Sequence, residues 1–158
     1  MSEQILSVVS QDKQVRPQSS RRLGDLGEQM ASEYLIRQGF RLVVSNFTVP
    51  VGRNWKGVQV SGEIDLIALE NDTLCFTEVK TRRSAEFAGP LSAVDRRKQR
   101  QITRTARMYR RIFGLNEIAF RFDVITVLLE KGQEPQIELI KGFWSEAKFR
   151  KKTWIGDT

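Results

Sequence analysis

The stretches Gly62-Glu-Ile-Asp-Leu-Ile-Ala-Leu69 and Thr73-Leu-Cys-Phe-Thr-Glu-Val-Lys80 are two short apolar runs interrupted by charged residues. The pair Asn71-Asp72 lies between them and favours a tight turn. We therefore predict a β-hairpin with a two-residue loop. Side chains alternate between the two faces of a strand, so the hairpin determines which charged residues meet.

The predicted register brings four charged side chains to one face of this hairpin. It places Asp65 opposite Glu78 and Glu63 opposite Lys80, with facing Cβ atoms about 4.5–5.5 Å apart. Facing carboxylates repel each other unless a cation lies between them. Surface Glu–Lys pairs are common on ordinary strands, but Phe76 shares this face and favours a covered site. The pattern is typical of a metal-dependent phosphodiesterase.

The composition restricts the chemistry that this site could perform. The chain contains no histidine, which excludes histidine bases, Ser-His-Asp triads and histidine-bound zinc. Hydrolysis would then depend on carboxylates, lysine, tyrosine or metal-bound water. Oxygen ligands suit hard ions, so we expect Mg²⁺ or Mn²⁺ as the cofactor, as one or two ions.

The bulk properties indicate one globular domain in the cytoplasm. The chain has 158 residues, of which 40% are hydrophobic and 28% charged, enough for a single core. No apolar run is long enough to span a membrane, and the first residues lack a secretory pattern. Cys75 is the single cysteine, so a reducing compartment is expected and Cys75 is predicted to lie in the core.

Periodicity divides the chain into an extension, a domain and a tail. Residues 1–22 are predicted to be a flexible extension and residues 144–158 a basic C-terminal tail, with the domain between them at 23–143. Within it we expect helices at 23–38 and 91–113 and strands at 41–47, 62–69, 73–80, 120–129 and 136–143. Residues 81–90 are predicted to be a loop, and residues 49–61 either a loop or a small two-stranded ribbon. This α-β-β-β-α-β-β order predicts an α/β fold, with helices packed on a central mixed five-stranded sheet.

Two acidic residues near the hairpin have open roles. Glu28 falls at the edge of the apolar stripe of the first predicted helix, where it would point toward the sheet. Glu63 is either a further ligand or the structural ion-pair partner of Lys80. We favour the ion pair, because one site rarely needs four anions.

The second predicted helix carries the excess positive charge of the protein. The whole chain has a net charge of +7, and this helix is strongly basic. Lys98 projects from its apolar side, where it either reaches the carboxylate site or a bound phosphate, or extends to the surface. The opposite arc is either a solvated surface or a nucleic-acid contact, which we favour. It includes Arg96, Arg97, Arg100 and Arg104.

Three separated motifs resemble one known family. The segments Gly62-Glu-Ile-Asp-Leu-Ile-Ala68, Phe76-Thr-Glu-Val-Lys-Thr-Arg82 and Arg121-Phe-Asp-Val124 are similar to those of the YraN-like proteins of the restriction-endonuclease-like superfamily, relatives of Holliday-junction resolvases. The resemblance implies a three-layer nuclease-like fold. It also implies that Glu28, Asp65, Glu78 and Lys80 form the catalytic site, with Glu28, Asp65 and Glu78 around the metal. Residues 47–61 are longer than the family pattern leads us to expect.

Three functional hypotheses follow. The first is a metal-dependent endonuclease acting on DNA, with branched or damaged DNA as candidate substrates. The second is a nucleic-acid-binding protein with the same fold and little or no turnover. The third is an assembly module whose basic helix docks an acidic protein. A nuclease that cuts both strands is often a homodimer, but no dimer surface is legible in the sequence.

Overall fold

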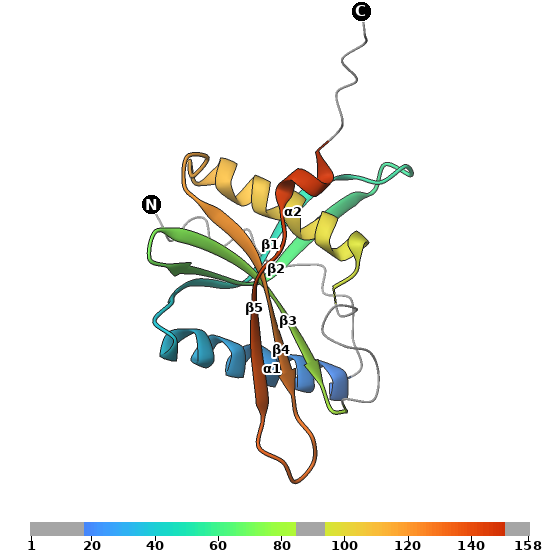
Figure 1. The fold of residues 1–158 in the computed structure, drawn as a ribbon. Coiled ribbons are helices and arrows are strands. Elements are labelled where there is room, and N and C mark those ends of the chain that lie inside the picture. The colour runs from blue at the N-terminus through green and yellow to red at the C-terminus, as the bar shows by residue number, and fades with distance from the viewer. Residues whose placement is uncertain (1–17, 85–93, 151–158) are drawn as a thin grey trace, which may run out of the picture.

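The elements of the computed structural model, which describes residues 18–84 and 94–150, follow the predicted order (Figure 1). The α/β architecture and the sequence α-β-β-β-α-β-β are thereby confirmed. The elements are α1 (Gln18–Arg37), β1 (Arg41–Arg53), β2 (Gln59–Glu70), β3 (Thr73–Arg82), α2 (Arg96–Ile112), β4 (Phe120–Leu128), β5 (Gln136–Trp144) and the short 3-10 helix η3 (Glu146–Phe149). In the described ranges, no helix combines the length and apolarity that a membrane crossing requires.

The five strands form one mixed sheet in the order β1-β2-β3-β4-β5. Neighbouring strands are antiparallel except for β3 and β4, which are parallel. A parallel pair needs a crossover connection, and the segment that contains α2 provides it. Because β3 carries the predicted Glu-any-Lys motif, this crossover brings α2 close to the candidate site.

Two apolar clusters show how the helices cover the sheet. The α2 side holds the larger cluster, and α1 covers the other, so the sheet is the middle of three layers. Side chains of β3 alternate between the two: Leu74 and Phe76 face the α2 cluster, whereas Cys75 and Val79 face the α1 cluster. Cys75 is fully buried, as the sequence predicted.

The hairpin of β2 and β3 has the predicted register where the strands are paired. Glu70 faces Thr73, and the pairing continues to Leu66 and Thr77. The two-residue loop starts at Asn71, whose φ of 51° lies in the left-handed region that asparagine tolerates. The turn chemistry at Asn71-Asp72 therefore set the strand register as expected.

The segment at residues 49–61, expected to be a loop or a small ribbon, extends β1 and β2. Val49 faces Gly62 and Arg53 faces Gln59, so the two strands form a hairpin that protrudes beyond the helices (Figure 1). We call residues 49–62 the arm. Of the two predicted alternatives, the ribbon is confirmed and the loop is wrong, because Pro50 and Gly52 do not end the strand but sit at an irregularity of its pairing.

The ends of the helices differ from the sequence predictions. The first helix already includes residues 18–22, which were assigned to the flexible extension, while residues 1–17 lie outside the described part. The second helix begins at Arg96 behind the cap of Asp95, whose carboxylate accepts a hydrogen bond from the backbone N–H of Lys98 (2.8 Å). The earlier predicted start at residues 91–93 lies outside the described residues.

The buried face of α2 also departs from prediction at its C-terminal end. The apolar residues Ile112 and Phe113, which helical periodicity would place on the core side, are exposed, whereas Arg110 is buried. The Arg110 guanidinium lies over the ring of Phe120 (3.8 Å to its centroid) and pairs with Glu146 (3.1 Å). Glu146 belongs to η3, so this C-terminal element provides the counterion with which Arg110 is buried.

Candidate functional site

The strands β2 and β3 separate where the predicted site begins. Their pairing ends at Leu66 and Thr77, and beyond this point β2 continues into the arm with α2, while β3 runs along α1 (Figure 1). Oδ2 of Asp65 accepts a hydrogen bond from the backbone N–H of Val79 (2.9 Å). This side-chain hydrogen bond takes the place of the next backbone hydrogen bond between the strands. We call the place where β2 and β3 diverge, beyond Leu66 and Thr77, the fork.

This fork overturns one of the predicted pairings. Lys80 lies 3.6 Å from Oε1 of Glu78, so its ion-pair partner is Glu78 and not Glu63. Glu63 is exposed on β2, and the strands have already separated at its position. The prediction assumed that β2 and β3 remain paired as far as Glu63 and Lys80, whereas the strands separate before these residues.

Glu78 is the buried centre of the site. Its side chain is only 4% exposed, and its Oε1 lies near two ammonium groups, those of Lys80 (3.6 Å) and Lys98 (3.8 Å). Its Oε2 is buried and has no hydrogen-bond partner in the described part of the chain. Burial and then the negative charge of Asp65 raise the pKa of Glu78 to about 8, against the opposing effect of the two lysines. Burial and the neighbouring carboxylate together outweigh the two lysines and disfavour the ionised form of Glu78.

Lys98 reaches the carboxylate of Glu78 from α2, the helix layer on one face of the sheet. It extends from the first turn of α2 and is half-buried, and its Nζ contacts Glu78 on β3. Of the alternatives open from the sequence, the structure shows the one in which Lys98 turns inward to the carboxylate site. A charge in this position is stabilised by its counterion.

Glu28 approaches the fork from α1, on the other side of the sheet. Burial raises its pKa to about 7, with further contributions from the negative charges of Asp65, Glu63 and Asp25. A hydrogen bond from the side chain of Asn46 opposes this shift. Glu28, Asp65 and Glu63 therefore share one electrostatic environment, although they come from two elements.

Two glycines that the sequence analysis did not single out allow α1 and α2 to pack closely against the sheet. A Cβ atom on Gly27 of α1 would collide with the hydroxyl of Thr81 on β3, and one on Gly62 of β2 would collide with that of Thr105 on α2. Each glycine directly precedes an acidic residue of the site, Glu28 or Glu63. A Gly-Glu pair occurs at both places in the sequence, and this repetition is the pattern that could have indicated the two glycines.

The donor set can be tested against a hard divalent cation. Asp65 and Glu78 offer two adjacent carboxylates, burial and then the charge of Asp65 raise the pKa of Glu78, and Oε2 of Glu78 lacks a hydrogen-bond partner. Within residues 18–84 and 94–150, no three acidic or cysteine side chains already form a complete ligand group. The residues fit a cation held by two carboxylates with water, the open coordination that Mg²⁺ commonly keeps, and Glu28 stands beside them.

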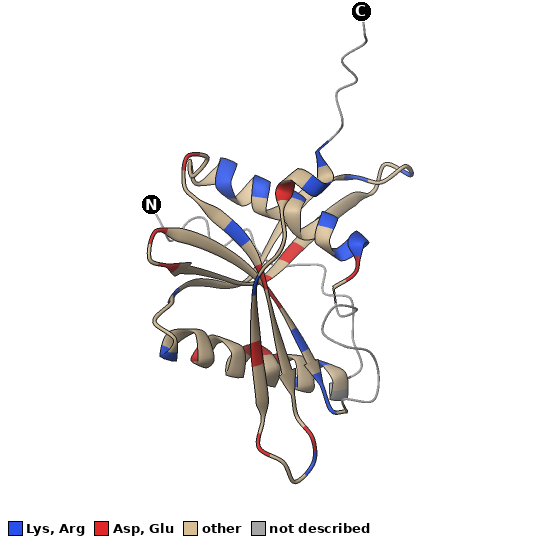
Figure 2. Ribbon diagram, in the orientation of Figure 1, with Lys and Arg blue, Asp and Glu red and all other residues tan. Residues whose placement is uncertain are grey.

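Basic residues recur along the length of α2 (Figure 2). Arg96, Arg97, Arg100 and Arg104 are exposed, as predicted for the arc opposite the core. Near the C-terminal end of α2, Glu146 of η3 pairs with Arg107 and Arg110. Arg96, Arg97, Arg100 and Arg104 form no ion pair within residues 18–84 and 94–150, and they lie in the N-terminal half of α2, which also contains Lys98.

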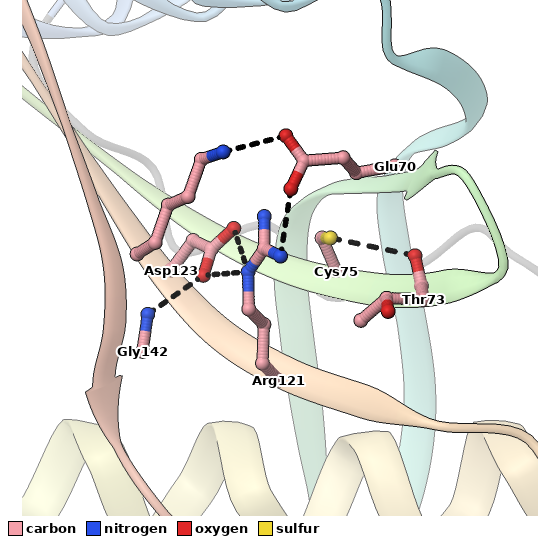
Figure 3. Close-up of polar contacts among 7 residues, drawn as sticks. Glu70, Thr73, Cys75, Arg121, Asp123 and Gly142 are labelled. Atoms are coloured by element: carbon pink, nitrogen blue, oxygen red, sulfur yellow. Dashed lines mark hydrogen bonds and ion pairs between the residues drawn. The ribbon is translucent and has the colours of Figure 1, made fainter.

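A second polar cluster lies on the α1 side of the sheet, away from the fork (Figure 3). Asp123 is fully buried and accepts hydrogen bonds from Arg121 (2.8 Å) and from the backbone N–H of Gly142 (3.0 Å). Arg121 also pairs with Glu70 (2.9 Å), which pairs in turn with Lys141 (2.6 Å). The contacts join the β2–β3 turn to β4 and β5, so we assign this cluster a structural role.

Comparison with known proteins places the chain in a family. The model of "Uncharacterised protein family UPF0102" matches residues 27–127, which include the fork and its two flanking glycines. The chain belongs to this family.

Individual relatives agree along most of their length. A UPF0102 protein of Trichlorobacter lovleyi is 43% identical over 119 residues, covering 75% of this chain and 86% of the relative. One of Rhodococcus jostii is 40% identical, covering 75% and 92%, and one of Renibacterium salmoninarum is 37% identical, covering 76% and 93%. The crystal structure of SSO0001 aligns over 82% of this chain and 55% of its own with 19% identity and a TM-score of 0.38, too distant to bear on function.

Proposed function

We propose that this protein is a metal-dependent endonuclease that hydrolyses phosphodiester bonds of DNA, as the resemblance to restriction-endonuclease-like proteins implies. One observation carries the proposal. Asp65 and Glu78 converge in the fork of the sheet, and both ammonium groups near Glu78 contact Oε1, which leaves the buried Oε2 without a partner. A buried oxygen without a hydrogen-bond partner needs an explanation, and a cation bound between Asp65 and Glu78 would supply one.

The proposed metal ligands are Asp65 and Glu78, with Glu28 assisting directly or through water. Bound Mg²⁺ or Mn²⁺ supplies charge neutralisation at the phosphate and lowers the pKa of coordinated water. Asp65 has one oxygen committed to the N–H of Val79, so Oδ1 is the atom that it can offer. This hydrogen bond also orients the carboxylate toward Glu78.

The two lysines receive distinct roles in the proposal. Lys80 shares β3 with Glu78 and is partly exposed, so it positions the attacking water or holds the scissile phosphate. Lys98 enters from α2 and is placed to contact a neighbouring phosphate. Beside Lys98, Arg96, Arg97, Arg100 and Arg104 would contact the DNA backbone, which gives affinity without reading the sequence.

Cleavage of a panel of nucleic acids tests the enzymatic proposal. Linear, gapped and branched DNA and matching RNA would be incubated with Mg²⁺ or Mn²⁺ and the wild-type protein. Asp65→Asn, Glu78→Gln and Lys80→Met are each expected to lower the rate at least ~100-fold. Glu138→Gln and Lys131→Met alter exposed residues of the same types away from the fork and serve as matched controls. Activity that persists in all three site variants would refute the proposal.

Metal binding is tested separately by calorimetric titration with Mn²⁺. The wild type is expected to bind Mn²⁺, and Glu78→Gln and Asp65→Asn to bind it weakly or not at all, while Glu138→Gln remains normal. Equal affinity of wild type and Asp65→Asn for Mn²⁺ would mean that Asp65 is not a ligand and that the ion binds elsewhere.

A second candidate function is nucleic-acid binding without turnover. Its support is that the described residues contain no complete three-ligand metal group, while Lys80 and Lys98 already provide counterions for Glu78. This alternative predicts retained DNA affinity in Glu78→Gln together with no cleavage by the wild type under any metal condition.

A further inference from the structure

The tip of the arm presents a single large aromatic side chain to solvent. Trp55 is 89% exposed, although indole is among the side chains that gain most from burial. An isolated exposed apolar residue needs no explanation by itself. The construction of the turn beneath Trp55 is what makes its exposure informative.

Hydrogen bonds close this turn and fix its backbone. Oδ1 of Asn54 accepts from the backbone N–H groups of Lys56 (2.9 Å) and Val58 (3.0 Å). The backbone N–H of Asn54 donates to the carbonyl of Val58 (2.9 Å), and the guanidinium of Arg53 donates to the carbonyl of Gly57 (2.7 Å). Trp55 therefore projects from an ordered turn, whose backbone needs little ordering on binding.

Basic residues occur beside the ring and along the arm. Nζ of Lys56 lies 5.0 Å from the centre of the Trp55 ring, and Arg53, two residues before Trp55 in the chain, is the last residue of β1. Arg104 of α2 lies at the side of the arm, where it donates to the carbonyl of Val51 (2.7 Å). An aromatic platform between cationic groups is the combination that binds a stacked nucleobase and its phosphates.

The arm connects this platform rigidly to the fork. Strand β2 runs without interruption from Gln59 to Asp65, a span of roughly 20 Å at the usual rise per residue. The arm is braced by α2: Gln101 donates to the carbonyl of Ser61 (3.2 Å), and Thr105 packs against Gly62. A DNA strand lying along α2 would thus meet the fork and the tip at a set separation.

We propose that Trp55 stacks on an unpaired nucleobase of DNA, so that the arm selects substrates in which single-stranded nucleotides adjoin the duplex held on α2. The inference rests on the proposed function and deepens it by assigning the substrate class. Duplex DNA presents its phosphates to the arginines but keeps its bases stacked, whereas gaps, flaps and junctions offer a free base. Arg53 and Lys56 then contact the phosphates on either side of that base.

The charge around the tip favours this occupant over an apolar one. A second copy of the chain, with its net charge of +7, would bring like charge against Arg53, Lys56 and Arg104. A polyanion gains from the same three residues. Self-association through Trp55 is therefore an outcome that the experiment must distinguish.

The test measures DNA affinity in EDTA, so that cleavage does not interfere. Forked, gapped and blunt duplex DNA of equal length would be titrated with wild type, Trp55→Ala and Trp55→Phe. Trp55→Ala should lose roughly 5- to 150-fold in affinity for forked and gapped DNA, and little for blunt duplex. Trp55→Phe should recover most of the loss, because it restores an aromatic face. Ile36→Ala, which removes another exposed apolar side chain, is the control and should bind like the wild type.

The outcomes separate this inference from the proposed function. Equal affinity of wild type and Trp55→Ala for every DNA would overturn the stacking role, while the cleavage and Mn²⁺ experiments would still stand. Loss of self-association in Trp55→Ala by sedimentation, with unchanged DNA binding, would overturn it in favour of a second copy. Absence of any DNA binding by the wild type would overturn both proposals.

Discussion

Oδ2 of Asp65 and the backbone N–H of Val79 form a 2.9 Å hydrogen bond across the fork of the sheet. The same aspartate is the second largest cause of the raised pKa of Glu78. One oxygen of Asp65 therefore holds the two diverging strands together, while its charge adds to burial in disfavouring ionised Glu78. The structural and electrostatic roles of this residue can be separated by substitution.

Asp65→Asn and Asp65→Ala should have opposite effects on the stability of the metal-free protein. Asparagine keeps an oxygen for the N–H of Val79 and removes the charge that repels Glu78, so its free energy of unfolding should equal or exceed that of the wild type. Alanine leaves the N–H without a partner and should cost about 1–3 kcal/mol. Urea unfolding in EDTA measures both. Equal destabilisation by the two substitutions would show that the hydrogen bond does not control the fork.

The pH dependence of stability should reveal the buried Glu78. Its pKa is about 8 in the folded protein and 4.5 in the unfolded chain, so the folded state binds more protons between these values. Stability contributed by the protonated group is then full below pH 4.5. It falls as the pH rises toward 8, with a slope of at most about 1.4 kcal/mol per pH unit. Glu28 acts in the same direction between 4.5 and about 7.

Glu78→Gln isolates this contribution. In EDTA, its unfolding free energy should fall less between pH 5 and pH 8 than that of the wild type or of the surface control Glu138→Gln. Three parallel pH profiles would contradict the raised pKa.

The two close helix–strand contacts predict that alanine is harmful at Gly27 and Gly62. Inside an exposed stretch of helix, Gly→Ala normally stabilises by about 1 kcal/mol. Here the added methyl group collides with Thr81 or Thr105, and each substitution should cost about 1–3 kcal/mol. Thermal or urea unfolding measures the change, and Gln29→Ala, at an exposed position of α1, serves as the control.

A double-mutant cycle would confirm the cause of this cost. Thr81→Ala should recover part of the stability lost in Gly27→Ala, because it removes the hydroxyl that the methyl group meets. Strictly additive effects would mean that the collision is relieved in another way.

The thiol of Cys75 should be unreactive in the folded protein. It is fully buried, and burial, followed by the nearby charge of Asp123, raises its pKa to about 11. Because the thiolate is the reactive form, iodoacetamide at pH 8 should modify it only after unfolding. Mass spectrometry with and without urea tests this, and an added surface cysteine, Glu138→Cys, reports the rate of a free thiol. Rapid modification of native Cys75 would indicate that β3 opens locally.

Local chemistry made much of the fold predictable. Asn71-Asp72 set the hairpin register down to Leu66 and Thr77, and alternation along β3 placed Cys75 and Glu78 on opposite faces. The position of Lys98 among apolar residues of its helix also indicated correctly that it turns inward. These inferences succeeded because they depend on the spacing of residues that are close together in the sequence.

Other predictions failed where distant segments meet. Nothing in the spacing of Glu63 and Lys80 shows that the ladder ends before it reaches them, and nothing near Arg110 shows that Glu146 will neutralise it. The glycines at 27 and 62 gained their meaning only when Thr81 and Thr105 were placed against them.

The sequence by itself therefore determined the order of the elements, the hairpin register and the set of charged residues available for chemistry. The tertiary structure alone decided which of these charges meet. The packing of α1 and α2 on opposite faces opens the sheet between β2 and β3, and Asp65 bridges the opening to Val79. Burial in that fork, a property of the whole fold and of no single segment, is what raises the pKa of Glu78 and leaves one of its oxygens unpaired.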